Sequence, residues 1–88
     1  MKSVFLASFL TDVKKLRNAK VQRAIVAAIV HVEQANALTD VRSLKRLSGH
    51  RDYFRIRVGD WRIGLHVAGD TVTFVRCLHR REIYRFFP

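Results

Sequence analysis

The sequence predicts an α+β fold of one domain, residues 1–88: a strand, a two-helix hairpin, a three-stranded antiparallel meander, and a short C-terminal helix or extended tail. Residues 21–32 repeat apolar side chains at helical spacing. Residues 53–67 alternate apolar and polar side chains around the turn Gly59-Asp60, and a second turn follows at 69–70. A chain of this length buries only about 60 to 65% of its unfolded surface, so it forms one modest core.

The N-terminal residues predict a short strand followed by a helix. Residues 4–6 form an apolar run that suits a strand. Ser8 is the expected N-cap of the helix, because a serine side-chain oxygen accepts a hydrogen bond from the first helical turn. The apolar positions of residues 9–16 recur at helical spacing, and we expect this helix to end near Asn18.

The second helix is the clearest element of the sequence. Its apolar positions form one stripe that faces a core: Val21, Ala24, Ile25, Ala28, Ile29 and Val32. The short link between the helices predicts an antiparallel helix pair. Periodicity then breaks from residue 36 to 52, where we expect a loop containing one short turn of structure around residues 41–47.

Residues 53–67 predict a β-hairpin with a definite register. A two-residue turn at Gly59-Asp60 pairs the flanking residues directly. The expected pairs are Val58 with Trp61, Arg57 with Arg62, Arg55 with Gly64, and Tyr53 with His66. By the same alternation, Trp61 belongs to the apolar face of the hairpin, which packs on the core.

The register places two arginines opposite each other. Like charges that face each other across a strand pair are destabilising, and no carboxylate lies between Arg57 and Arg62 in this pattern. Two interpretations follow: the arginines are solvated surface side chains, or they form a site for an anion.

The third strand of the meander is expected from Thr71 to Leu78 and is apolar enough to be central in the sheet. Which of its faces points inward remains open. The single cysteine, Cys77, excludes an internal disulfide and has no metal-ligand spacing with the four histidines, so we expect a small buried side chain and no metal site. The aromatic residues of 84–87 give the C-terminal segment side chains with which to pack.

The charge of the chain predicts a polyanionic partner. The net charge is +10, and nine of the ten basic residues in 45–88 are arginine, whose planar fork matches phosphate oxygens better than the point charge of lysine. Charge alone leaves nucleic acid, an acidic protein and an anionic membrane surface open as partners. The longest apolar run, residues 24–30, is far shorter than the roughly 20 residues that span a bilayer, so we expect a cytoplasmic protein.

Three stretches together resemble the RelE/ParE superfamily of bacterial toxins, and the resemblance covers essentially the whole chain. They are Leu44-Lys-Arg-Leu-Ser-Gly, Tyr53-Phe-Arg-Ile-Arg-Val-Gly-Asp-Trp-Arg-Ile and His79-Arg-Arg-Glu-Ile-Tyr-Arg. The tyrosine of the last stretch resembles the RelE branch, whose members cleave messenger RNA on the ribosome.

The resemblance implies a twisted sheet with the helix pair on one face and the RNA site on the other. It implies the mRNA and the ribosome as partners, together with a cognate antitoxin that covers the site. The implied reaction needs no metal or small-molecule cofactor: the ribose 2'-OH attacks the adjacent phosphorus and leaves a 2',3'-cyclic phosphate. The protein then has to remove a proton and stabilise charge on the phosphoryl oxygens.

The resemblance also assigns roles within the C-terminal half. Tyr84 matches the tyrosine proposed as general base, Arg80 the arginine of the same motif, and Arg62 the arginine that contacts the scissile phosphate. Arg55 and Arg57 stand where RelE carries two lysines. Because arginine stays charged at accessible pH, these two residues can act only electrostatically.

Proton transfer is thereby left to Tyr84 or to a second candidate, His79. A tyrosine needs neighbouring positive charge to act as a base near neutral pH, whereas histidine titrates there in its ordinary state. Further expected contacts to the substrate, through phosphates or by stacking on bases, come from Lys45, Arg46, Arg51, Tyr53 and His66.

Two other functions remain open from the sequence. The ParE-like branch of the superfamily poisons DNA gyrase and cleaves no RNA. A non-catalytic module that binds nucleic acid or an antitoxin would carry the same charge, but its affinity would depend steeply on salt and no cleavage would accompany it.

Overall fold

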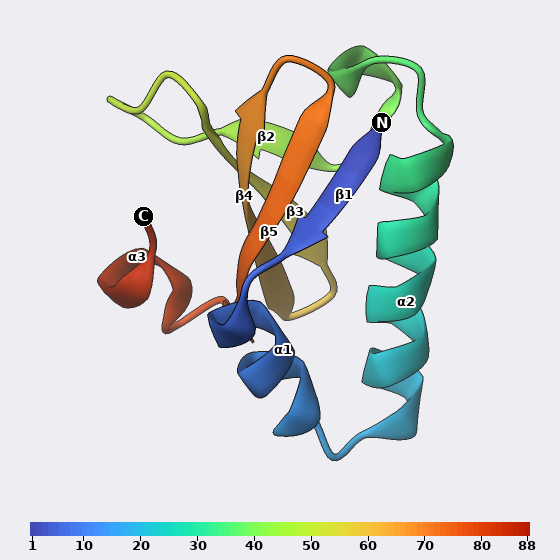
Figure 1. Ribbon diagram of the computed structural model, residues 1–88. Helices are drawn as coiled ribbons and strands as arrows, with labels where there is room; N and C mark the ends of the chain where they lie inside the picture. Colours follow the sequence, from blue (N-terminus) through green and yellow to red (C-terminus); the bar gives the residue numbers. More distant parts are fainter.

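The computed structural model describes all residues, 1–88, as a five-stranded sheet with helices on both sides (Figure 1). Its elements follow in the order β1 (Lys2–Phe5), α1 (Ala7–Lys14), α2 (Ala19–Gln34), the 3-10 turn η1 (Leu38–Asp40), β2 (Leu44–Arg46), β3 (Tyr53–Val58), β4 (Trp61–Ala68), β5 (Thr71–His79) and α3 (Ile83–Phe86). The strand order across the sheet is β1-β5-β4-β3-β2. Strand β1 is parallel to β5, and the other pairs are antiparallel.

The predicted α+β order is confirmed, with one strand more than the sequence indicated. Residues 44–46, expected within a loop, form β2 and pair with the outer edge of β3. A three-residue strand shows no alternation of its own, since its existence depends on the partner strand that supplies its hydrogen bonds. The loop between β2 and β3 projects from the sheet at the upper left of Figure 1.

The start of α1 differs from the sequence prediction. Leu6, not Ser8, occupies the N-cap position, and no side chain caps this helix. The Ser8 hydroxyl instead donates a hydrogen bond to the Val75 carbonyl oxygen at 2.6 Å, which ties α1 to β5. Asn18, expected near the end of the first helix, caps α2: its side-chain oxygen accepts from the backbone N–H of Lys20 and of Val21.

The core lies between the sheet and the two long helices. Helix α1 packs against β5, and α2 packs against β3 and β1. The predicted apolar stripe of α2 is confirmed, because Ile25 and Val32 are fully buried and their neighbours on the stripe are half-buried. None of the helices is both long and apolar enough to cross a membrane.

The hairpin has the predicted register. Strands β3 and β4 pair Val58 with Trp61, Arg57 with Arg62, Arg55 with Gly64, and Tyr53 with His66. Gly59 turns the chain with a φ of 59°, a left-handed value that glycine adopts without strain. Trp61 lies on the helix-covered face and packs against the core, as its alternation predicted.

An irregularity in β5 explains why its inward face could not be predicted. Gly64 pairs with Arg76 and Leu65 with Phe74, so Val75 is an extra residue opposite them. Such a bulge reverses the alternation of side chains along the strand. Val72 and Phe74 are buried before the bulge, and Cys77 is buried after it.

Cys77 is the small buried side chain that was predicted. It is a free thiol and 1% exposed. Burial, reinforced by the nearby Asp12 carboxylate, raises the pKa of the Cys77 thiol to about 12. The side chain therefore stays protonated and packs as an apolar group.

Asp12 is the only buried acidic residue and joins α1 to β5. Its Oδ2 accepts hydrogen bonds from Nε of Arg76 at 2.7 Å and from the backbone N–H of Cys77 at 3.0 Å, and its Oδ1 accepts from Nη2 of Arg76 at 3.1 Å. The hydrogen bonds that Arg76 donates to the Asp12 carboxylate raise the pKa of Arg76. One carboxylate thus links α1 to the part of β5 that lies beyond its pairing with β1.

Replacing Asp12 by asparagine is expected to destabilise the fold by about 2 to 4 kcal/mol, because the half-buried Arg76 guanidinium loses the negative charge and the two-pronged acceptor that the buried carboxylate provides. The free energy of unfolding from urea titration measures this loss. Asp60→Asn is the matched control, since Asp60 lies 3.9 Å from Arg80 in a solvent-exposed pair and should change stability by less than about 1 kcal/mol. Equal losses in both variants would contradict the structural role of Asp12.

Candidate functional site

The face of the sheet opposite α2, which we call the arginine face, carries Arg55, Arg57 and Arg62. The hairpin register fixes this placement, because Arg57 pairs with Arg62 and Arg55 is two residues away on the same side of β3. The prediction that these arginines share one face is confirmed. The opposite face of the same strands is apolar and packs on α2.

Arg62 is held at the hairpin turn by the backbone. Its Nη1 donates to the carbonyl oxygens of Gly59 at 2.8 Å and of Trp61 at 2.9 Å. These bonds use one nitrogen of the guanidinium and leave its other N–H groups without protein acceptors. The residue is half-buried, so its orientation is fixed while part of its donor fork remains available.

The electrostatics around Arg62 identify the residues that gather at this place. Burial is the largest cause that lowers the pKa of Arg62, followed by the positive charges of Arg55 and Arg57 and, more weakly, of Arg80. Ionised Tyr84 acts in the opposite direction. Three other arginines and Tyr84 therefore lie within electrostatic reach of Arg62, and an anion placed beside Arg62 would relieve the repulsion among the positive charges.

A small pocket of about 190 Å³ opens beside Arg55. Its lining residues are Lys45, Arg46, Leu47, Ser48, Arg55 and Tyr84. Lys45 enters the site because β2 pairs it directly with Arg55. Nη1 of Arg55 donates to the Ser43 carbonyl oxygen at 3.1 Å, whereas its Nε is buried without a hydrogen-bond partner. The Lys45 ammonium group has no hydrogen-bond or ion-pair partner, so N–H donors of both Lys45 and Arg55 remain available in the pocket.

Tyr84 stands over this pocket on α3. The residue is 63% exposed, and its hydroxyl makes no hydrogen bond within the protein. It also lines a neighbouring pocket with Leu47, Ser48, His50, Phe87 and Pro88. An exposed phenol beside Arg55 and Lys45 is positioned to contact a bound phosphodiester rather than to support the core, where Ile83 and Phe87 are buried instead.

Arg80 approaches the site from the end of β5. Its backbone N–H donates to the Asp60 carbonyl oxygen at 2.8 Å, and its Nε lies 3.9 Å from the Asp60 carboxylate. Asp60, in the turn between Arg57 and Arg62, thus places a carboxylate near the arginines that the strand register alone does not reveal. Both side chains are more than half exposed, so the pair leaves Arg80 able to move to a ligand.

His79 lies on the other side of the sheet from Tyr84. It pairs with Trp61 across β4 and β5, and the two rings are arranged edge to face with their centroids 5.6 Å apart. His79 lines a cavity with Asp12, Arg76 and other residues near α1. The structure therefore does not bring the His79 side chain to the face that carries Arg55, Arg57 and Arg62, and the bulge at Val75 is the physical reason.

Of the remaining predicted contact residues, Arg46 contributes to the lining of the pocket beside Arg55, and the others lie around it. Arg46 pairs with Phe54, and its guanidinium lies over the Phe54 ring at 5.4 Å, on the side away from Lys45. Arg51 is exposed in the loop between β2 and β3. Tyr53 is half-buried and surrounded by aromatic rings. The centroid of its ring lies 4.9 Å from that of His66, 5.6 Å from that of Phe87 and 6.1 Å from that of His50. Tyr53 and His66 thus pack on each other on the arginine face.

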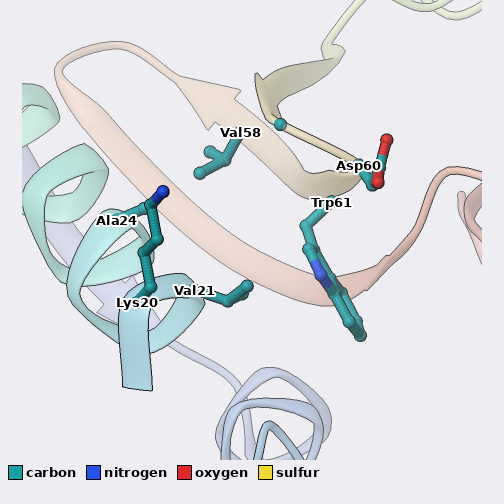
Figure 2. Close-up of a pocket in the computed structure, with 7 residues that line it drawn as sticks. Lys20, Val21, Ala24, Val58, Asp60 and Trp61 are labelled. Carbon is teal, nitrogen blue, oxygen red and sulfur yellow. The ribbon is translucent and has the colours of Figure 1, made fainter. Parts of the chain in front are cut away.

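A separate cavity of about 210 Å³ lies on the helix-covered side, between the start of α2 and the hairpin turn (Figure 2). Figure 2 shows the side chains of Val21, Val58 and Trp61 around it, with Lys20 and Asp60 at its rim. Its apolar walls and the absence of arginine distinguish it from the pocket beneath Tyr84. No three His, Cys, Asp or Glu side chains gather closely enough to hold a metal ion anywhere in the chain.

The sequence and the fold both match known toxins. The family model described as "ParE toxin of type II toxin-antitoxin system, parDE" matches residues 4–84. The chain is 39% identical over 89 residues to Toxin RelE3 of Methanocaldococcus jannaschii, and the alignment covers all of both proteins.

Solved structures agree with this match. The RelB-RelE antitoxin-toxin complex from Methanococcus jannaschii contains a chain 37% identical to this one, with a TM-score of 0.79 and coverage of 97% of this chain and 99% of that one. The archaeal RelE-RelB complex from Pyrococcus horikoshii OT3 shares the fold, with a TM-score of 0.73 at 15% identity over 93% of this chain and 97% of that one. With a family match over residues 4–84 and a RelE relative along its whole length, the chain belongs to the RelE/ParE superfamily of type II toxin-antitoxin toxins.

Proposed function

We propose that this toxin is an endoribonuclease that cleaves mRNA on the ribosome and thereby inhibits translation. The observation that carries the proposal is the grouping of Arg55, Arg57, Arg80 and the exposed Tyr84 around Arg62, with Tyr84 and Arg55 lining one pocket. Full-length similarity to a RelE toxin supports the same reaction class. Arginine forks recognise phosphate oxygens, and the tyrosine supplies a group that can exchange a proton.

The proposed reaction is an internal transphosphorylation. Tyr84, as the general base, removes the proton of the ribose 2'-OH, and the resulting oxygen attacks the adjacent phosphorus. The bond from phosphorus to the 5' oxygen breaks, the 5' oxygen takes up a proton from solvent, and the products are a 2',3'-cyclic phosphate and a 5'-OH. The arginines remain charged throughout and stabilise the negative charge that grows on the phosphoryl oxygens.

We assign the arginines by their surroundings. Arg62 is half-buried and fixed by two backbone carbonyls, so it is preorganised to contact the scissile phosphate. Arg55 and Lys45 line the pocket beneath Tyr84 and hold a neighbouring phosphate. Arg57 and Arg80 are exposed and strengthen the positive potential that attracts the RNA backbone.

The proposed partners are a cognate antitoxin, mRNA and the ribosome. Solved relatives are complexes of RelE with RelB, which supports an antitoxin for this chain. A net charge of +10 suits both an acidic protein segment and an RNA backbone. Action on ribosome-bound messages would place the toxin in the cytoplasm.

A second candidate function is inhibition of DNA gyrase, because the matching family model is that of ParE toxins. Induction of the gene in growing cells separates the two functions. Primer extension on total mRNA should reveal cuts within translated codons, and these cuts should disappear when ribosomes are kept off the message. Intact messages together with DNA breaks would overturn the ribonuclease proposal in favour of gyrase inhibition.

A further inference from the structure

Gly64 lies in the interior of β4, where glycine weakens a strand and offers no side chain for packing. The backbone conformation does not require it. Positive φ angles among the glycines occur only at Gly49, Gly59 and Gly69, so an L-residue would fit the extended backbone at position 64. The reason for a glycine here must therefore lie in what surrounds it.

The ring of Phe87 occupies the space that a side chain at position 64 would need. A Cβ atom added to Gly64 would lie 2.8 Å from Cγ, Cδ1 and Cε1 of Phe87, whereas carbon atoms in favourable contact are about 3.5 to 4.0 Å apart. Phe87 is 2% exposed and forms a small cluster with Leu47 and Ile83. The rings of Phe87 and Tyr53 are also arranged edge to face, with their centroids 5.6 Å apart.

This contact bears directly on Tyr84. Helix α3 is only four residues long and has no side-chain N-cap, so it cannot hold its own shape. Tyr84 lies between the two buried residues of the segment, Ile83 and Phe87, and is itself 63% exposed. The place of the phenol is thus set by its buried neighbours and not by its own packing.

The other side-chain contacts that follow Tyr84 in α3 are weaker. Phe86 is 51% exposed and lies over the Arg76 guanidinium at 5.6 Å. Arg85 and Glu82 form a solvent-exposed pair at 3.6 Å. Exposed contacts of these kinds contribute about 1 kcal/mol or less each. The seat of Phe87 over Gly64 is the main attachment of the segment after Tyr84.

We propose that Gly64 is a positioning residue for the cleavage reaction: by lacking a side chain it seats the Phe87 ring on β4, and this seat fixes the Tyr84 phenol above Arg55 and Lys45. This inference rests on the proposed ribonuclease function and extends it to residues that touch no substrate. A methyl group at position 64 would lift Phe87 and move the phenol, while the main core between the sheet and α2 would be untouched.

The test compares Gly64→Ala and Phe87→Ala with the matched control Phe86→Ala, which removes an exposed ring from the same helix. Cleavage of a message bound to purified ribosomes gives kcat and KM, and thermal melting reports the fold. We expect Gly64→Ala and Phe87→Ala to stay folded and to lose about 10- to 100-fold in kcat with KM changed less than about threefold, because a displacement near 1 Å can lower a rate by about 100-fold. Phe86→Ala should stay within about threefold of the parent in kcat.

Replacing Phe87 by leucine in the Gly64→Ala background should recover part of the lost kcat, since it removes the ring that the new methyl group meets. Unaltered cleavage by Gly64→Ala, or equal losses in Phe86→Ala and Phe87→Ala, would overturn the proposal. Failure of Gly64→Ala to fold would also overturn it, because the glycine would then serve the sheet rather than the phenol.

A second readout is independent of cleavage. The chain has only two tyrosines, so the NMR ring signals of Tyr84 can be separated from those of Tyr53. These signals should shift in Gly64→Ala and not in Phe86→Ala. If these signals shift but the parent cuts no RNA, the ribonuclease proposal is wrong, while the role of Gly64 in positioning Tyr84 through Phe87 is supported. If the parent cuts RNA and the Tyr84 signals stay unchanged in Gly64→Ala, only the positioning role of Gly64 is refuted.

Discussion

Replacing Arg62 by alanine is expected to lower the rate of mRNA cleavage by about 100- to 1,000-fold, the loss typical of removing one preorganised donor to a developing negative charge. Two backbone carbonyls hold its guanidinium at the hairpin turn. Burial and the neighbouring arginines both lower the pKa of Arg62, which means that its charge is poorly compensated within the protein. A phosphate in the transition state supplies the missing compensation.

The stability of the Arg62→Ala variant should change by no more than about 1 kcal/mol. The variant loses the two hydrogen bonds that the Arg62 side chain donates to backbone carbonyls, but it also loses the repulsion from Arg57, which pairs with it across the strands. Single-turnover cleavage of ribosome-bound message and urea unfolding measure the two effects separately. Arg23→Ala is the matched control, because it removes the same charge from an exposed position on α2. Equal loss of cleavage in Arg23→Ala would mean that total charge, and not the arginine face, determines the rate.

Replacing Tyr84 by phenylalanine is expected to lower the cleavage rate by about 100- to 10,000-fold, the range that a positioned general base contributes. The phenylalanine ring keeps the packing of the tyrosine ring and removes only the hydroxyl, which bonds to nothing in the protein. The free energy of unfolding should therefore stay the same. A large kinetic effect without a change in stability would identify the hydroxyl as the reacting group.

His79→Gln is the companion to this variant, because the sequence left His79 open as an alternative base. The residue contacts Trp61 on the far side of the sheet, so its replacement should change the cleavage rate by less than about threefold. Both variants are measured on the same programmed ribosomes. Loss of cleavage in His79→Gln with retention in Tyr84→Phe would show that Tyr84 is not the base.

The sequence predicted those parts of the fold that local pattern determines. The stripe of α2 and the register of the hairpin follow from side-chain spacing and a two-residue turn, and both are confirmed. Other features depend on distant partners. Strand β2 exists because β3 pairs with it, and Ser8 bonds to Val75 rather than capping its own helix. No spacing within either segment reveals such a partner.

The candidate site likewise contains residues that the sequence could place and one that it could not. Alternation in β3 and β4 placed Arg55, Arg57 and Arg62 on one face, because neither strand carries an extra residue. Unbroken alternation in β5 from Phe74 onward would have put His79 on the arginine face. The bulge at Val75 reverses that alternation, and a bulge shows no distinct pattern in an apolar strand.

The most direct test of RNA cleavage uses two messages bound to purified ribosomes, identical except for a 2'-deoxynucleotide on the 5' side of the cut. We expect the toxin to cut the unmodified message, leaving a 2',3'-cyclic phosphate and a 5'-OH, and to leave the deoxy message intact. The reason is that the attacking 2'-OH is absent from the second message. Equal cutting of both messages, or no cutting of either, would contradict attack by the 2'-OH at the arginine face.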